Sequence, residues 1–113
     1  MASTALTVAA FVLIAVVATV LFAQDPYNPT GASAGLEFYQ KLADWAKSCD
    51  VIVVSDNPYS EICFDCRPPS FLEVAGGREV GMEFHSLSQS YNCCARRTGM
   101  LVGNKDVITG MWS

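Results

Sequence analysis

A long apolar run without charge, at the start of the chain, constrains its folding more than any other feature. Between residues 5 and 23 only Thr7 and Thr19 are not apolar, and residues 1–24 hold no ionisable side chain. The run covers 19 positions, close to the ~20 residues that a helix needs to span a membrane. A membrane-spanning or anchoring helix is therefore one interpretation of residues 5–23.

Two other interpretations of the run stay open. A signal peptide fits less well, because no positive charge precedes the run and the bulky Leu21 stands three positions before a cut after Ala23. A buried core segment fits the residues near the end of the run, several of which are β-branched and favour strands. They are Val16, Val17, Thr19 and Val20. We therefore divide the chain into an apolar leader, residues 1–23, and a domain at 24–113.

The composition of the whole chain is that of a small folded protein. Its 113 residues are 51% hydrophobic and 16% charged, which excludes a disordered chain. Seven Lys and Arg against eleven Asp and Glu give a net charge of -4. Because nucleic-acid-binding proteins usually present a basic face, we expect no nucleic-acid partner.

The cysteines indicate reduced thiols rather than a disulfide framework. There are five, an odd number, and two of them are adjacent. Reduced thiols are typical of an intracellular environment. Cys63 and Cys66 form a C-x-x-C pattern that could contribute to a zinc site, but the rest of the chain lacks matching ligand spacing. We therefore expect no metal site.

Hydrophobic patterning after the run predicts an α/β fold. The expected elements are a helix at 34–48 capped by Ser33, strands at 51–54, 80–85 and 100–102, a helical turn at 71–75 and a helix starting at 105–112. The continuous apolar stretch at 51–54 is typical of a parallel strand buried on both faces. Asp56 and Ser86 follow two of these strands. Ligands of open α/β sheets bind at such carboxyl ends, so these residues are the first functional candidates.

Four short motifs then carry a resemblance to a known family. They are Asn28-Pro29-Thr30-Gly31, Asp56-Asn57-Pro58-Tyr59, Ser86-Leu87-Ser88, and Arg97 ahead of Gly99. In this order and spacing they resemble the pyridoxal-phosphate (PLP) aminotransferases of class I/II, fold type I. Residues 37–104 are similar to the LL-diaminopimelate aminotransferase branch. The resemblance extends from about residue 20 to the end, and implies part of a large domain with a mostly parallel sheet.

The resemblance also implies a role for each motif residue around pyridoxal 5'-phosphate. Asp56 is implied to lie beside the pyridine nitrogen, where a carboxylate favours the protonated form. Asn28 and Tyr59 are implied to donate hydrogen bonds to the ring oxygen. Ser86 and Arg97 are implied to bind the phosphate, which suits a hydroxyl and a fork-shaped cation.

One position departs from the family pattern in a way that matters chemically. The family reads Ser-x-Ser-Lys, and this chain reads Ser86-Leu87-Ser88-Gln89. The family lysine forms the Schiff base with the cofactor and moves the proton, whereas an amide is neither nucleophilic nor basic. We therefore expect Gln89 to leave the site inactive, with the cofactor held non-covalently at best. The family's substrate-carboxylate arginine has no counterpart in the chain.

Two functional hypotheses follow. The first is an aminotransferase-like chain whose ancestral reaction, implied by the resemblance, moves an amino group between an amino acid and a 2-oxo acid. Its partners would be these small molecules; a homodimer and a cytoplasmic location are what the family implies. The alternative is a membrane-anchored pseudoenzyme or interaction module that uses residues 5–23 to associate with a membrane.

Overall fold

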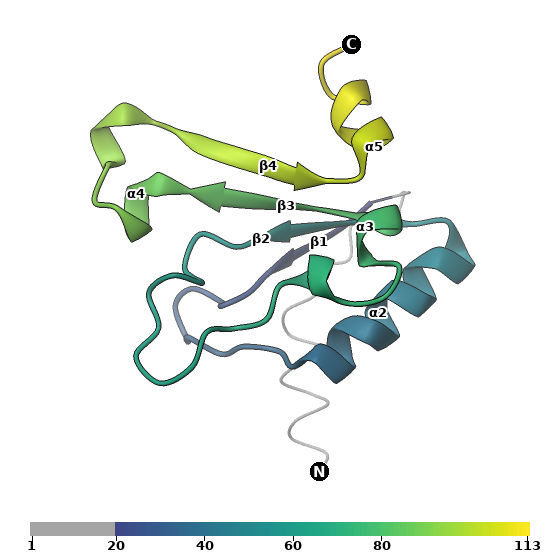
Figure 1. Ribbon diagram of the computed structural model, residues 1–113, viewed down its shortest axis with the longest axis horizontal. Coiled ribbons are helices and arrows are strands. Elements are labelled where there is room, and N and C mark those ends of the chain that lie inside the picture. The colour runs from purple at the N-terminus through teal and green to yellow at the C-terminus, as the bar shows by residue number, and fades with distance from the viewer. Residues whose placement is uncertain (1–19) are drawn as a thin grey trace.

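A four-stranded mixed sheet organises residues 20–113, the part of the chain that the computed structural model describes. Its strands lie in the order β1 (Val20–Gln24), β2 (Ile52–Asp56), β3 (Gly81–Ser86) and β4 (Gly99–Gly103). The first three strands run parallel, and β4 is antiparallel to β3 (Figure 1). The predicted α/β class and the mostly parallel sheet are confirmed.

One long helix and several short helical segments lie between the strands or follow them. They are α2 (Leu36–Cys49), η1 (Phe71–Glu73), α3 (Gly77–Val80), α4 (Leu87–Ser90), η2 (Cys94–Arg96) and α5 (Lys105–Gly110). The helices predicted at 34–48 and 105–112 and the turn at 71–75 are therefore confirmed, with shifted ends. The predicted cap at Ser33 is wrong: the chain stays extended through Gly35, which precedes α2 without any side-chain capping bond.

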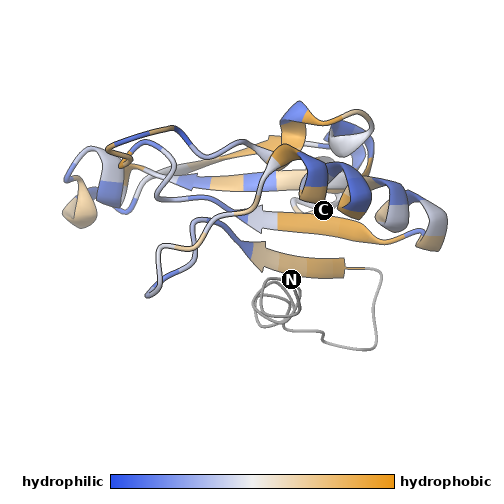
Figure 2. Ribbon diagram, turned by 90° about the horizontal axis from the view of Figure 1, so that it is seen from below, coloured by the Kyte–Doolittle hydropathy of each residue, from blue (hydrophilic) through white to orange (hydrophobic). Residues whose placement is uncertain are grey.

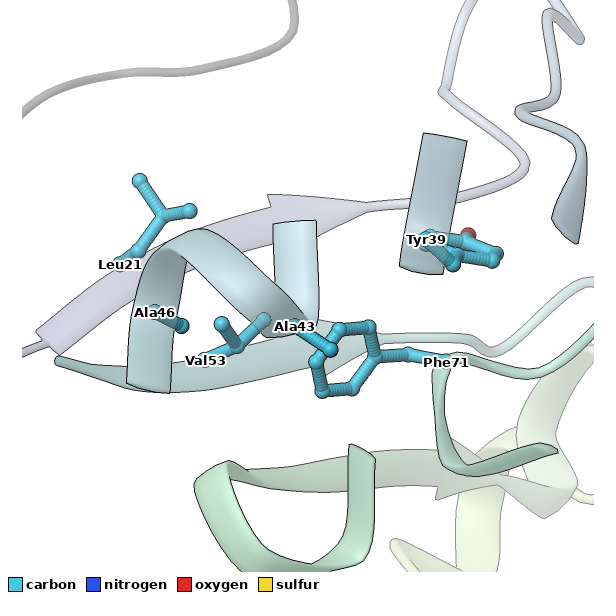
Figure 3. Packing of buried hydrophobic residues seen from close by; sticks show 6 residues of the cluster. All are labelled: Leu21, Tyr39, Ala43, Ala46, Val53 and Phe71. Carbon is cyan, nitrogen blue, oxygen red and sulfur yellow. The ribbon is translucent and has the colours of Figure 1, made fainter. Parts of the chain in front are cut away.

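The hydrophobic core lies between α2 and one face of the sheet. Its buried residues are Leu21 on β1, Val53 on β2, Tyr39, Ala43 and Ala46 on α2, and Phe71 in η1 (Figure 3). Hydrophobic colour concentrates in β1 and β2, whereas α2 alternates between its two faces (Figure 2). The amphipathic spacing of the helix and the apolar central strand thus explain why these two elements pack together.

A close approach between η1 and β3 fixes how the core closes. The aromatic ring of Phe71 is fully buried and lies directly against Gly81, the first residue of β3. A Cβ atom at position 81 would overlap two atoms of this ring. Gly81 is therefore the residue that lets the Phe71 ring reach the sheet.

The end of the apolar N-terminal run belongs to the sheet. Residues 20–23 lie in β1 and pair in parallel with β2, so the membrane-helix interpretation is wrong for this end of the run. The β-branched character of Val20 agrees with its strand conformation. Residues 5–19, with the rest of that prediction, lie outside the described residues. Between residues 20 and 113 no helix is long and apolar enough to cross a membrane.

Candidate functional site

The three parallel strands end at one edge of the sheet, and a polar residue stands at each end. Gln24 ends β1, Asp56 ends β2 and Ser86 ends β3. In Figure 1 these strands point toward the side of the molecule where α4 lies. This edge therefore gathers the strand-end residues that the sequence singled out, Asp56 and Ser86.

Side chains at the ends of β1 and β2 hold one another in place. Gln24 is the register partner of Asp56, and its Nε2 donates to Asp56 Oδ2 at 3.2 Å. The backbone N–H of Asn28 donates to Gln24 Oε1 at 3.2 Å. The Asn28 amide Nδ2 in turn donates to the Tyr59 hydroxyl at 3.2 Å. We call these four residues, Gln24, Asn28, Asp56 and Tyr59, the Asp56 corner.

The Asp56 corner retains free acceptor capacity. Within residues 20–113, Asp56 Oδ1 has no hydrogen-bonding partner, and no Lys or Arg forms an ion pair with the carboxylate. A shallow pocket beside the corner is lined by Asn28 and Tyr59 together with Pro26 and Ile62. The Tyr59 phenol and the Asn28 amide therefore line this pocket, and the Asp56 carboxylate lies at the end of the neighbouring strand β2, outside the lining.

Gln24 was not predicted as a site residue. Its position at the end of β1, directly beside Asp56 in the register, is what gives it a role. Its only signal in the sequence is its place directly after the apolar run, and this becomes informative only once a strand is known at residues 20–24.

The chain after β3 forms a second part of the edge, residues 86–97, which we call the Gln89 segment. Ser86 precedes α4, and its Oγ accepts a hydrogen bond from the Ser88 backbone N–H at 3.1 Å. Ser88 is buried and Gln89 is exposed. Ser90 Oγ donates to the Pro58 carbonyl at 3.4 Å, which holds α4 near the loop that carries Tyr59.

The Arg97 side chain is not brought into contact with the other candidates. Arg97 follows η2 in a left-handed conformation, with a φ of 50°, and is exposed. Its guanidinium has no hydrogen-bonding or ionic partner among residues 20–113, and the same holds for Arg96. The structure thus gathers Asn28, Asp56 and Tyr59 and places Ser86 at the same edge, with Arg97 free in solvent.

A buried carboxylate beneath the edge was not predicted. Glu83 on β3 is only 1% exposed, and its carboxylate accepts hydrogen bonds from Asn57 Nδ2 at 3.1 Å and Ser70 Oγ at 3.0 Å. His85 Nε2 lies 2.8 Å from Glu83 Oε1. A glutamate between the apolar residues Met82 and Phe84 was the only signal in the sequence, since Asn57 and Ser70 are distant along the chain.

A second buried carboxylate joins the start of α2 to the loop after β1. The Tyr39 hydroxyl and the Ala34 backbone N–H both donate to Asp25 Oδ2, the latter at 3.0 Å. Burial, helped by this neighbouring carboxylate, raises the pKa of Tyr39 well above its ordinary value. The tyrosine is therefore held as a neutral donor in the core.

The cysteines of the described residues are unpaired. Cys63 and Cys66 are both exposed free thiols. Between residues 20 and 113 no three His, Cys, Asp or Glu side chains come together as potential metal ligands.

These features define a class of protein: an open α/β domain with a small-molecule site at the carboxyl edge of its parallel strands. Residues 13–113 match the profile of aminotransferase class I and II. The chain belongs to this family, whose members use pyridoxal 5'-phosphate.

The chain is also similar to named members of that family. It is 50% identical over 95 residues to LL-diaminopimelate aminotransferase of Aquifex aeolicus, and 52% identical over 95 residues to that of Dehalococcoides mccartyi. Each alignment covers 83% of this chain and 24% of the relative. The chain thus spans about a quarter of the length of these relatives.

Solved structures show the same fold. Substrate-bound BacF of Bacillus subtilis matches with a TM-score of 0.77 and 38% identity, over 80% of this chain and 23% of BacF. An aminotransferase of Staphylococcus aureus matches with a TM-score of 0.77 and 36% identity, over 80% of this chain and 24% of that structure. The resemblance seen in the sequence motifs is confirmed at the level of family and fold.

Proposed function

We propose that this chain is an aminotransferase-derived protein of the LL-diaminopimelate branch that binds pyridoxal 5'-phosphate without forming a covalent bond to it. The observation that carries the proposal is the Asp56 corner, where Gln24 orients Asp56 and Asn28 contacts Tyr59. On this proposal residues 24–113 form a partial large domain together with residues 20–23, which complete β1, and the apolar leader is reduced to residues 1–19.

The donor set of the edge fits the cofactor in charge and hydrogen-bonding character. The unpartnered Oδ1 of Asp56 would accept a hydrogen bond from a protonated pyridine nitrogen. The Tyr59 hydroxyl and the Asn28 amide would donate to an anionic ring oxygen. Ser86 and Arg97 would contact the phosphate, with the exposed guanidinium free to turn toward it. When bound, the cofactor supplies an electron sink for bonds at the substrate α-carbon.

Gln89 limits what this arrangement does. Its amide lone pair is delocalised, so it neither attacks an aldehyde nor carries a proton between carbon atoms. Removal of a general base alone reduces rates by roughly 10²–10⁴. We therefore expect reversible binding of the cofactor and no measurable transfer of an amino group.

The substrate class follows from the relatives and stays part of the proposal. LL-Diaminopimelate and a 2-oxo acid are the compounds to test first, because the relatives at 50% and 52% identity are named for that activity. Homodimer formation is likewise an expectation carried by the family.

Equilibrium dialysis against pyridoxal phosphate tests the proposal directly. We expect reversible binding that Asp56→Ala weakens roughly 10- to 100-fold, since hydrogen bonds to charged groups contribute about 1.5–3 kcal/mol. Asp44→Ala, which removes an exposed carboxylate on α2, is the matched control and leaves binding unchanged. Borohydride treatment should yield no stable adduct at the edge. An adduct there, or equal affinity in Asp56→Ala and the wild type, contradicts the proposal.

Membrane attachment through the charge-free run is a separate hypothesis and, because residues 20–23 lie in β1, it now concerns residues 5–19. Carbonate extraction of membranes from cells that express the chain tests it. Retention in the membrane pellet supports an anchor, and release into the supernatant contradicts one.

A further inference from the structure

The Glu83 carboxylate accepts hydrogen bonds from two separate segments of the chain and lies close to His85 on its own strand. Ser70 Oγ lies 3.1 Å from Oε1 and 3.0 Å from Oε2, and Asn57 Nδ2 lies 3.1 Å from Oε1. His85 Nε2 approaches the same Oε1 at 2.8 Å. The carboxylate is 1% exposed, so solvent does not replace any partner that is removed. Such a group is stabilised only by the donors around it.

Two of these neighbours of Glu83, Asn57 and His85, are adjacent in sequence to the candidate cofactor residues. Asn57 directly follows Asp56, and His85 directly precedes Ser86. The backbone N–H of Asn57 also donates to the Phe84 carbonyl at 2.8 Å, which fixes the end of β2 against β3. Glu83 therefore joins the two strand ends at the level just beneath the site.

The Asn57 side chain depends on Glu83 for its orientation. Asn57 is 4% exposed, and its Oδ1 has no hydrogen-bonding partner among the described residues. Its amide is therefore oriented by the single bond from Nδ2 to Glu83. The chain next passes through Pro58 to Tyr59, so the direction of Asn57 influences how Asp56 and Tyr59 face each other.

We infer that Glu83 is a positioning residue of the cofactor edge, which acts through Asn57 on Asp56 and through His85 on Ser86. The identity of the ligand in this inference rests on the proposed function, whereas the contacts of Glu83 do not depend on it. Ser70 is the third partner, and its side chain caps η1, which is not adjacent in sequence to any candidate cofactor residue. A positioning role therefore predicts unequal effects when Asn57 and Ser70 lose their bonds to Glu83.

Three variants of the full chain separate positioning from simple packing. Glu83→Leu keeps a side chain of similar size and removes both acceptors, whereas Glu83→Gln keeps an acceptor at Oε1. Glu73→Leu is the matched control, because Glu73 is an exposed glutamate that also binds Ser70, through the Ser70 backbone N–H at 3.0 Å. We expect Glu83→Leu to weaken pyridoxal-phosphate binding at least tenfold, Glu83→Gln to restore it to within about threefold, and Glu73→Leu to leave it unchanged.

A ligand-free measurement keeps this inference separate from the proposed function. Amide chemical shifts of Asp56, Asn57 and Ser86 should move in Glu83→Leu and remain in place in Glu73→Leu. Unchanged shifts and affinity in a folded Glu83→Leu protein overturn the inference. If the wild type does not bind pyridoxal phosphate, the proposed function fails, and the shifts alone decide the positioning role.

Smaller truncations cover the case in which Glu83→Leu does not fold. Asn57→Ala removes only the branch toward Asp56, and Ser70→Ala removes only the branch toward η1. We expect Asn57→Ala to move the Asp56 amide shift and weaken binding at least fivefold more than Ser70→Ala does. Equal effects of the two variants would show that Glu83 contributes to folding alone and would overturn the inference.

Discussion

The two halves of the sheet edge are built differently. In the Asp56 corner, side chains bind side chains: Gln24 orients Asp56, and Asn28 contacts Tyr59. In the Gln89 segment the side chains form hydrogen bonds with backbone groups. The Ser86 hydroxyl accepts from the Ser88 N–H, and the Ser90 hydroxyl donates to the Pro58 carbonyl. The corner thus fixes the directions of its functional groups, whereas the segment fixes only the path of its backbone.

This difference explains why the edge can keep the family's arrangement although Gln89 replaces the lysine of the family pattern. Gln89 is exposed and has no side-chain partner among residues 20–113, so no bond of the fold requires a particular side chain there. Asp56 is tied to Gln24 across two strands. Replacement at position 89 therefore changes chemistry without changing structure, and replacement in the corner changes both.

The largest expected effect comes from replacing Gln89 with the lysine of the family pattern. We expect Gln89→Lys to convert reversible binding into covalent capture of pyridoxal phosphate, because an amine then stands in the family's position within α4. The measurement is mass spectrometry of peptides after borohydride reduction. An adduct at position 89 is expected in the variant and not in the wild type.

The three native lysines provide the internal control for that experiment. They are Lys41, Lys47 and Lys105. Their modification reports non-specific reaction and should be equal in both proteins. If position 89 of the Gln89→Lys variant is modified no more than these three lysines, the edge does not direct the cofactor toward α4.

The core beneath the Asp56 corner gives the next largest effect. Phe71→Ala removes a fully buried ring that packs on α2 and the sheet, and we expect it to lower the free energy of unfolding by about 3–5 kcal/mol. Denaturant unfolding measures this value. Phe64→Ala is the control, because that ring is 99% exposed, and it should stay within ~0.5 kcal/mol of the wild type. Similar losses in both variants would contradict the observed core.

The features that could be predicted from the sequence are those that depend on local pattern. The strand-end positions of Asp56 and Ser86 followed from apolar runs and the rule for parallel sheets, since both depend on local pattern. The helix α2 and strands β2 and β3 were predicted for the same reason. The single turns α3, α4 and η2 were missed, because four residues or fewer show no periodicity.

What the sequence did not reveal depends on distant contacts. The Gln24–Asp56 bond joins residues 32 positions apart, and the Asn57–Glu83 bond joins residues 26 apart. The cap predicted at Ser33 failed because Asp25 accepts a hydrogen bond from the Ala34 N–H, and Gly35 is the residue that directly precedes α2. Residue type alone does not specify such partners.

A pH titration sharpens the comparison by following the core tyrosine. Burial and the Asp25 carboxylate raise the pKa of Tyr39 in the folded chain, whereas the unfolded chain titrates near pH ~10. The folded state therefore binds the Tyr39 proton more tightly than the unfolded state does. The resulting contribution to the free energy of unfolding is fully present below about pH 10. Above that pH the free energy of unfolding falls by up to ~1.4 kcal/mol per pH unit. Denaturant unfolding at pH 9–11 measures the slope, which should be shallower in Tyr39→Phe. Parallel slopes in the two proteins would contradict this origin.

The smallest expected effect concerns which guanidinium serves the Gln89 segment. Both Arg96 and Arg97 are exposed and unpartnered in the described chain, but Arg97 leads into β4 and follows the family's pattern ahead of Gly99. We expect Arg97→Ala to weaken binding of pyridoxal phosphate about three- to tenfold and Arg96→Ala by less than about twofold, because an exposed cation contributes at the lower end of the range for charged hydrogen bonds. Binding of pyridoxal, which lacks the phosphate, should not distinguish the two variants.

If Arg96→Ala has the larger effect, the backbone of the segment presents the neighbouring side chain to the phosphate. If neither variant changes binding, the Asp56 corner alone holds the cofactor, and the Gln89 segment has lost its part in binding as well as in chemistry.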